Sequence, residues 1–163
     1  MLASAILAGV SAGWLTGGRD LRRLGDVRIR LWSLLALAVA LRVLAPLFGE
    51  LSAIAYVAAF ASIAVVALVD RRLPGMSLIA AGATLNCIVV AANGGMPVDP
   101  AALAAAGVTM PNDRLHIELL PATRFPQLAD VLPLALFRSV YSVGDVLLAA
   151  GGFWLPFVWL RRR

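Results

Sequence analysis

The chain has 163 residues, of which 61% are hydrophobic and only 14% are charged, and its mean hydropathy is +0.90. A soluble domain is about half apolar and about a quarter charged, so this composition requires lipid as the solvent for part of the surface. The net charge of +5 comes entirely from arginine, because the sequence contains no lysine. The arginines follow apolar segments in short runs without interleaved aromatic residues. This pattern indicates membrane topology and argues against nucleic acid as a partner.

Apolar segments recur five times along the chain, and each is roughly long enough for a helix to cross a bilayer. The first has arginines after it and none before it, which is the reverse of a secretory signal, so we expect a retained helix. Gly49–Glu50 and Pro74–Gly75 are expected turns between neighbouring segments. The predicted fold is an all-α membrane protein in a single domain, with the lipid bilayer as its partner and spans at about 2–18, 31–48, 51–69, 76–92 and 142–160.

The arginines also predict the orientation. Five follow the first span, two follow the third and three end the chain, whereas three lie in the segment 94–141 and one within a span. Positive residues favour the cytoplasmic side. We therefore expect a multi-pass protein of the cytoplasmic membrane, with its N-terminus outside and its C-terminus inside.

Three glycines of the first span are spaced four apart, at Gly9, Gly13 and Gly17, and so lie on one helix face. Such a strip allows two helices to approach closely. We favour packing within the chain, and a contact with another membrane subunit is the alternative. Cys87 is the only cysteine, which excludes an intramolecular disulfide. With no phosphate loop, haem motif or zinc pattern, we expect neither a metal nor a cofactor.

The segment 94–141 is predicted to be a large extracytoplasmic loop. Asp99 and Pro100 followed by alanines up to Gly107 indicate a short capped helix. The remainder carries prolines amid leucines and is too apolar for a free linker. We expect it to lie on the outer membrane surface or to re-enter the membrane, where irregular backbone must be covered by protein or face water.

Polar residues gather at the same outer side. A charge within a span is a functional hypothesis by default, and Arg42 is such a charge. Asn86 and Asn93 share one face of the fourth helix, and Asp145 lies near the outer end of the last. These four residues, with His116 of the loop, are our candidates for a cleft that binds a lipid headgroup, a small ligand or a partner subunit.

Three of these residues also have structural interpretations. Arg42 either pairs with Asp145 or extends its side chain to the outer surface. Asp145 has the spacing of a capping box with Ser142. His116 is the lone histidine, and packing within the loop is the expected role, because one histidine does not make a metal site.

A set of motifs runs through the C-terminal half: Asn93-Gly94-Gly95-Met96-Pro97-Val98, His116, Thr123, Leu128-Ala129-Asp130, Ser142-Val143-Gly144-Asp145 and Gly151. With these motifs the chain resembles a family of small bacterial membrane proteins, the domain-of-unknown-function family 5317. The resemblance implies a membrane protein, and it implies no activity.

The placement of two acids is similar to lipoprotein signal peptidase, a membrane aspartic protease. Asp130 precedes the last helix and Asp145 lies near its start, so the resemblance implies a catalytic dyad in which two carboxylates share a proton. That family has four spans and a different loop order. An aspartyl hydrolase at the outer leaflet is therefore the alternative to a non-enzymatic binding protein, and the sequence leaves open whether the protein is an enzyme. A transporter is less favoured, because no internal repeat is visible.

Overall fold

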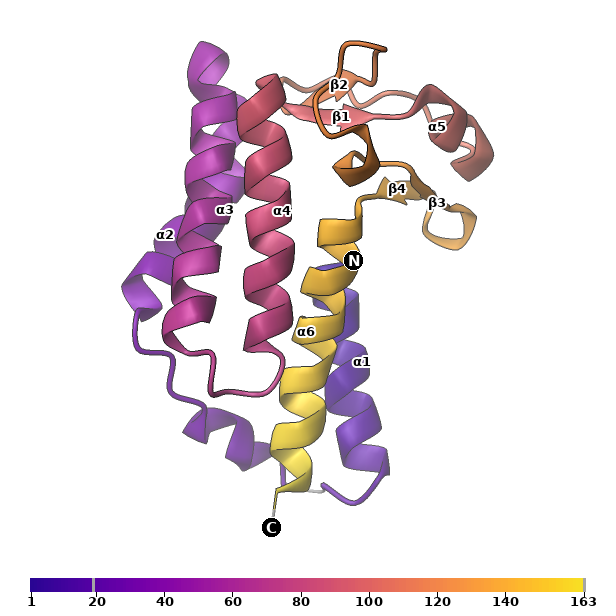
Figure 1. Ribbon diagram of the computed structural model, residues 1–163. Coiled ribbons are helices and arrows are strands. Elements are labelled where there is room, and N and C mark those ends of the chain that lie inside the picture. The colour runs from indigo at the N-terminus through magenta and orange to yellow at the C-terminus, as the bar shows by residue number, and fades with distance from the viewer. Residues whose placement is uncertain (19, 163) are drawn as a thin grey trace.

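The computed structural model describes residues 1–18 and 20–162, and it is a helical bundle with an irregular segment packed at one end (Figure 1). The helices are α1 (Leu2–Leu15), α2 (Trp32–Leu44), α3 (Ser52–Val69), α4 (Met76–Asn93), α5 (Pro100–Ala106) and α6 (Val143–Arg161). Short 3-10 helices are η1 (Leu21–Asp26), η2 (Ala45–Leu51), η3 (Pro126–Leu128) and η4 (Ala135–Phe137). The strands are β1 (Met96–Val98), β2 (His116–Glu118), β3 (Leu132–Leu134) and β4 (Ser139–Tyr141).

Three helical segments of the described chain are long and apolar enough to cross a membrane: Trp32–Val69, Met76–Asn93 and Val143–Arg161. The first contains α2, η2 and α3. Gly49 has a φ of +58° there, and α3 packs against α2. The predominantly helical, membrane-compatible fold is thus confirmed. The number of crossings and their orientation stay predictions, and Arg19 and Arg163 of the arginine count lie outside the described residues.

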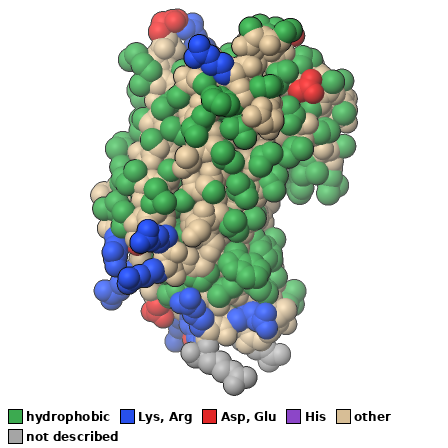
Figure 2. Space-filling model, in the orientation of Figure 1, with side chains coloured by type: hydrophobic (Ala, Val, Ile, Leu, Met, Phe, Trp, Pro, Cys, Tyr) green, Lys and Arg blue, Asp and Glu red, His purple; other side chains and the backbone are tan. Residues whose placement is uncertain are grey.

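Apolar side chains cover the middle of the molecule, and the charged side chains gather near its two ends (Figure 2). This distribution follows the sequence, in which the apolar runs are bounded by arginines and acids. Many large apolar side chains are exposed along the helices, among them Leu47, Val43 and Ile54. Exposed apolar surface on this scale is what lipid, rather than water, would cover.

The five long helices pack in the order α1–α6–α4–α3–α2. Small residues make the contacts close. A Cβ at Gly82 would lie 2.4 Å from the carbonyl oxygen of Gly144, and one at Gly9 would overlap the backbone of Phe153. Gly9 and Gly13 thus face α6 within the chain, whereas Gly17 has a φ of +116° and no neighbour within 4 Å. A subunit contact through all three glycines stays a prediction.

The segment between α4 and α6 folds onto the bundle rather than extending from it. β1 pairs in parallel with β2, and its other edge is bridged by Asp130. Met96 and Leu115 belong to the same buried core as residues of α3 and α4. As predicted, Asp99 caps α5 and Gly107 ends it in the left-handed region. The four strands contradict the all-α prediction. Sequence reasoning missed them because strands of three residues are too short to show an alternating pattern.

An apolar hairpin extends from this segment beside the start of α6 (Figure 1). β3 pairs antiparallel with β4, and η4 forms the connection between them. The hairpin exposes four large apolar side chains: Leu132, Leu134, Leu136 and Phe137. Such a patch is typical of a surface that meets lipid or a partner.

Candidate functional site

A polar network joins α4 to the start of α6. The Asn86 side chain donates from Nδ2 to Oδ1 of Asp145 at 2.9 Å, and its Oδ1 accepts from the Ser142 hydroxyl at 2.9 Å. Asn86 and Ser142 are almost fully buried, while Asp145 is half-buried. The network therefore satisfies its buried polar groups, and Asp145 is its partly exposed member.

Ser142 and Asp145 also form the predicted capping box. The Asp145 backbone N–H donates to the Ser142 hydroxyl, and the Ser142 backbone N–H donates to the Asp145 carboxylate. Gly144 lies between them, and a Cβ there would sit 1.9 Å from Oδ1 of Asn86. Only glycine lets α6 begin this close to α4, so the position of the Asp145 carboxylate depends on this residue.

Arg42 lies in the last turn of α2, on the same side of the bundle as this network. Its guanidinium stacks 4.5 Å from the ring centre of Tyr56, a buried residue of α3. The predicted pair with Asp145 does not form: the ion pairs among the described residues involve neither Arg42 nor Asp145. The aromatic face offers the guanidinium an alternative partner, and the donor edges of the arginine stay available.

Asp130 is the most unusual polar group of the segment. Only 6% of it is exposed, and its Oδ1 has no hydrogen-bond partner among the described residues. Its backbone is held on both sides: its N–H donates to the Pro97 carbonyl, and its carbonyl accepts from the Asp99 N–H. Burial and the nearby charge of Asp145 raise the pKa of the Asp130 carboxyl to about 8, against the opposing charge of Arg42.

Asp130 and His116 line one cavity of about 320 Å³ beneath α5 and the hairpin. Thr109, Arg138 and Ser139 supply further polar groups to its wall, and apolar side chains such as Leu103 complete it. A volume in this range suits a small group or part of a larger ligand. Arg42, Asn86, Asn93 and Asp145 are not lining residues of this cavity.

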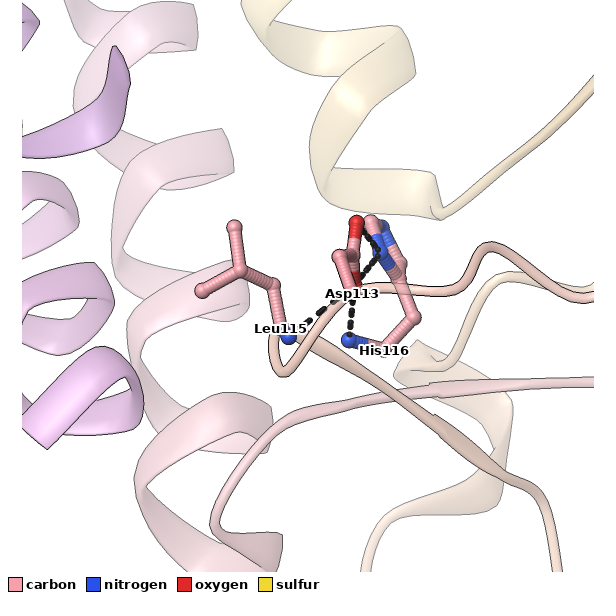
Figure 3. Close-up of polar contacts among 3 residues, drawn as sticks. All are labelled: Asp113, Leu115 and His116. Carbon is pink, nitrogen blue, oxygen red and sulfur yellow. Dashed lines mark hydrogen bonds and ion pairs between the residues drawn. The ribbon is translucent and has the colours of Figure 1, made fainter. Parts of the chain in front are cut away.

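Asp113 holds the His116 ring in place (Figure 3). Both carboxylate oxygens lie 2.9 Å from Nδ1 of His116, and Oδ1 also accepts the backbone N–H groups of Leu115 and His116. Burial acts to raise the pKa of Asp113, but the His116 ring and these N–H groups outweigh it and lower the pKa below its usual value. The orientation of the ring is thus fixed by a neighbouring acid.

The predicted residues therefore fall into three places. Arg42, Asn86 and Asp145 lie in or beside the polar network, and Asp130 and His116 lie at the cavity. Asn93 is at neither: its amide donates to the carbonyls of Val89 and Arg124 and accepts from the Arg124 N–H, which ties η3 and its flanking chain to α4.

Sequence reasoning missed three participants. Tyr56 looked like an ordinary core residue, and Ser142 looked like a cap alone. Asp113 precedes His116 by three residues, and that spacing is the signal that could have revealed their contact. No three His, Cys, Asp or Glu residues of the described chain come together as a metal site.

The comparisons with known proteins give one match. The model of a family of unknown function, DUF5317, matches residues 25–157, which include the polar network, Arg42 and the whole segment with Asp130 and His116. No curated protein and no solved structure matches the chain.

Proposed function

The chain belongs to the family of unknown function DUF5317, and because that name states no activity, we propose one from the site itself. The protein is a membrane protein that binds the phosphate-bearing headgroup of a lipid at the outer membrane surface. The headgroup lies between the polar network and the segment that covers it. Arg42 supplies the cation for the phosphate, since a guanidinium matches phosphate oxygens through paired N–H donors.

One observation carries this proposal: Asp130 is buried with an unpartnered oxygen. An unpaired buried polar atom costs free energy. Asp130 also lines the cavity of about 320 Å³, so a ligand group bound there would supply the missing hydrogen bond. A carboxyl that stays protonated near neutral pH can donate a hydrogen bond as well as accept one. His116 lines the same cavity as Asp130 and offers a further polar contact, and Asp145 offers one at the polar network.

The accompanying topology has five crossings, with the N-terminus outside. The helices α1, α2, α3, α4 and α6 are the spans, and the exposed side chains of the β3–β4 hairpin rest in the outer leaflet. A reporter fused after Arg163 should read cytoplasmic, and one inserted after Gly107 should read extracytoplasmic. Reporters that read the same side at both positions would refute this topology.

A soluble headgroup tests the binding function. Glycerophosphoethanolamine, which has no acyl chains, should raise the melting temperature of the purified protein in detergent as its concentration increases. Asp130→Ala and Arg42→Gln should lose most of that shift. Glu118→Gln, an exposed charge change in the same segment, is the matched control and should retain it. Equal shifts in all four proteins, or none in the wild type, would refute the proposal.

An aspartyl hydrolase using Asp130 and Asp145 remains the second candidate. The observation in its favour is that the charge of Asp145 acts on Asp130, as in a pair of carboxylates that share a proton. The hydrogen bonds of Asp145 to Asn86 and Ser142 speak against it, because they commit that carboxylate to the helix start. A lipid-anchored peptide in proteoliposomes should be cleaved by the wild type and left intact by Asp130→Asn. An uncleaved peptide with the wild type would eliminate this candidate.

A further inference from the structure

An apolar groove of about 400 Å³ opens inside the bundle. All five long helices contribute to its walls, so the row α1–α6–α4–α3–α2 curves around it. Leu24, Val27 and Ile29 of the segment between α1 and α2 line it as well. Val39 of α2 lines the groove and is still 54% exposed, which means that the groove is open along α2.

The groove and the polar groups lie on the same faces of four helices. On α2, Leu35 and Val39 line the groove and Arg42 follows at the next helical repeat. On α6, Asp145 comes three residues before Leu148, which also lines it. At 1.5 Å per residue, each polar group lies only about 5 Å along its helix from the nearest of these apolar side chains.

The other two helices repeat the arrangement. On α3, Tyr56 precedes the groove residue Ile63 by seven residues, and on α4, Asn86 follows Ile79 by seven. α2 and α4 run towards the covering segment while α3 and α6 run away from it, yet all four polar residues fall on the same side of the groove. Arg42 and Asp145, each one turn beyond a groove residue, therefore form the polar end of the groove. On α3 and α4, the buried core residues Phe60 and Ala83 lie between the groove and Tyr56 or Asn86.

The polar end carries both signs of charge. The Arg42 guanidinium rests on Tyr56 and has no acidic partner within 4.0 Å in the described chain, and the Asp145 carboxylate accepts hydrogen bonds but has no cation. A ligand that fits this end has an anion and a cation of its own and an apolar tail. A phosphoethanolamine headgroup on a diacylglycerol has these features.

We propose that the curved face binds one phospholipid of the phosphatidylethanolamine class, with an acyl chain in the groove, its phosphate at Arg42 and its ammonium group at Asp145. This inference rests on the proposed headgroup site and extends it to a whole lipid. The ammonium group can donate to a carboxylate, whereas a trimethylated choline cannot, and a glycerol headgroup has no cation. Headgroup preference is therefore the property that the charges predict.

Native mass spectrometry of the full chain in detergent, after delipidation, tests the proposal. The probes are phosphatidylethanolamine, phosphatidylcholine and phosphatidylglycerol with identical oleoyl chains, added at equal concentrations. We expect the phosphatidylethanolamine adduct to exceed each of the others at least threefold. Asp145→Asn should reduce it to the level of phosphatidylcholine, and Arg42→Gln should reduce all three adducts.

The groove is tested separately. Val39→Trp fills the groove from its exposed side and should lower all three adducts at least fivefold. Leu37→Trp places the same ring at another exposed position of α2 that does not line the groove, and it should leave the adducts unchanged. Equal adducts for the three lipids, or adducts unaffected by Val39→Trp, would overturn the proposal. A dimer that disappears in Val39→Trp would instead assign the groove to a second chain.

The two proposals fail in different ways. If glycerophosphoethanolamine stabilises the protein but Val39→Trp binds lipid normally, the headgroup site stands and the groove assignment is wrong. If neither the soluble headgroup nor the phospholipids bind, both proposals are wrong. The melting temperature of each variant without ligand shows whether it is folded, so a loss of adducts can be attributed to the site.

Discussion

The two ends of the bundle each bury an aspartate, and the two are buried almost equally. Asp70 follows α3 and is 5% exposed, while Asp130 lies in the covering segment and is 6% exposed. Asp70 accepts the backbone N–H of Arg30 at 3.0 Å and lies 3.8 Å from its guanidinium Nε. Asp130 has an oxygen with no partner at all in the described chain.

The presence or absence of side-chain partners distinguishes the two aspartates, whereas their burial does not. A buried carboxylate needs compensation, and at Asp70 the chain supplies it from Arg30, which ties the segment before α2 to the end of α3. At Asp130 the hydrogen bonds are made by the backbone alone, and the side chain is free to contact the proposed ligand. The end that is complete by itself is the structural end, and the incomplete one is the candidate site.

The end of the bundle with the candidate site should be most sensitive to the spacing between α4 and α6. Gly144→Ala places a methyl group against Asn86 and the Gly82 carbonyl, so the helices must separate and the polar network must break. We expect a loss of about 3 kcal/mol or more in the free energy of unfolding. Gly25→Ala adds the same methyl group where nothing lies within 4 Å, and it should have little effect in the same thermal unfolding assay in detergent. Equal stabilities would mean that this contact is not tight.

The comparison of the two aspartates predicts a larger loss of stability on mutation of Asp70 than on mutation of Asp130. Asp70→Ala leaves the Arg30 N–H without its acceptor and should cost about 2–3 kcal/mol. Asp130→Asn removes a carboxyl that has no partner for Oδ1 and should cost less than 1 kcal/mol near neutral pH. Melting temperatures of the two variants test this order. A larger loss for Asp130→Asn would identify Asp130 as a structural residue.

Much of the helical part could be predicted from the sequence, because its signals are local. Apolar runs bounded by arginines predicted the helices, Ser142 and Asp145 predicted their own capping box, and Asp99 predicted the start of α5. Each of these depends on residues a few positions apart, and each needs no knowledge of the rest of the fold.

The candidate site could be predicted only in outline, because its geometry depends on distant contacts. Asp130 was named for its similarity in placement to a protease acid, and nothing nearby in the sequence indicates that its backbone bridges to Pro97 and Asp99. For the same reason, the stacking of Arg42 on Tyr56 could not be predicted, and the pair with Asp145 was one of two open alternatives. These contacts join residues that only the packed helices bring together.

The pH dependence of stability should depend mainly on Asp130. The pKa of Asp130 is about 8 in the folded protein and about 3.9 in an unfolded chain, so the folded state holds the extra proton between these values. Stability should therefore fall as the pH rises through this window and level off above it, by about 2 kcal/mol between pH 6 and pH 8. Asp130→Asn should remove most of this slope. An identical slope in the variant would assign the pH dependence to another group.

A further prediction concerns the closure of the segment between α4 and α6 over the end of the bundle with the candidate site. Asn93→Ala removes two hydrogen bonds that tie Arg124 to α4 and a third, to the Val89 carbonyl, within α4. These bonds lie near the surface, where water replaces them, so the cost should be about 1 kcal/mol. Hydrogen–deuterium exchange should nevertheless become faster around Arg124, because the tie is local. Asn112→Ala, an exposed asparagine in the same segment, is the control and should leave that exchange unchanged.

If water reaches the Asp130 carboxyl only when this segment opens, Asn93→Ala should also reduce the pH dependence of stability partway towards that of Asp130→Asn. Faster exchange with an unchanged slope would mean that the strand contacts of Asp130, and not the Asn93 tie, keep water from its carboxyl.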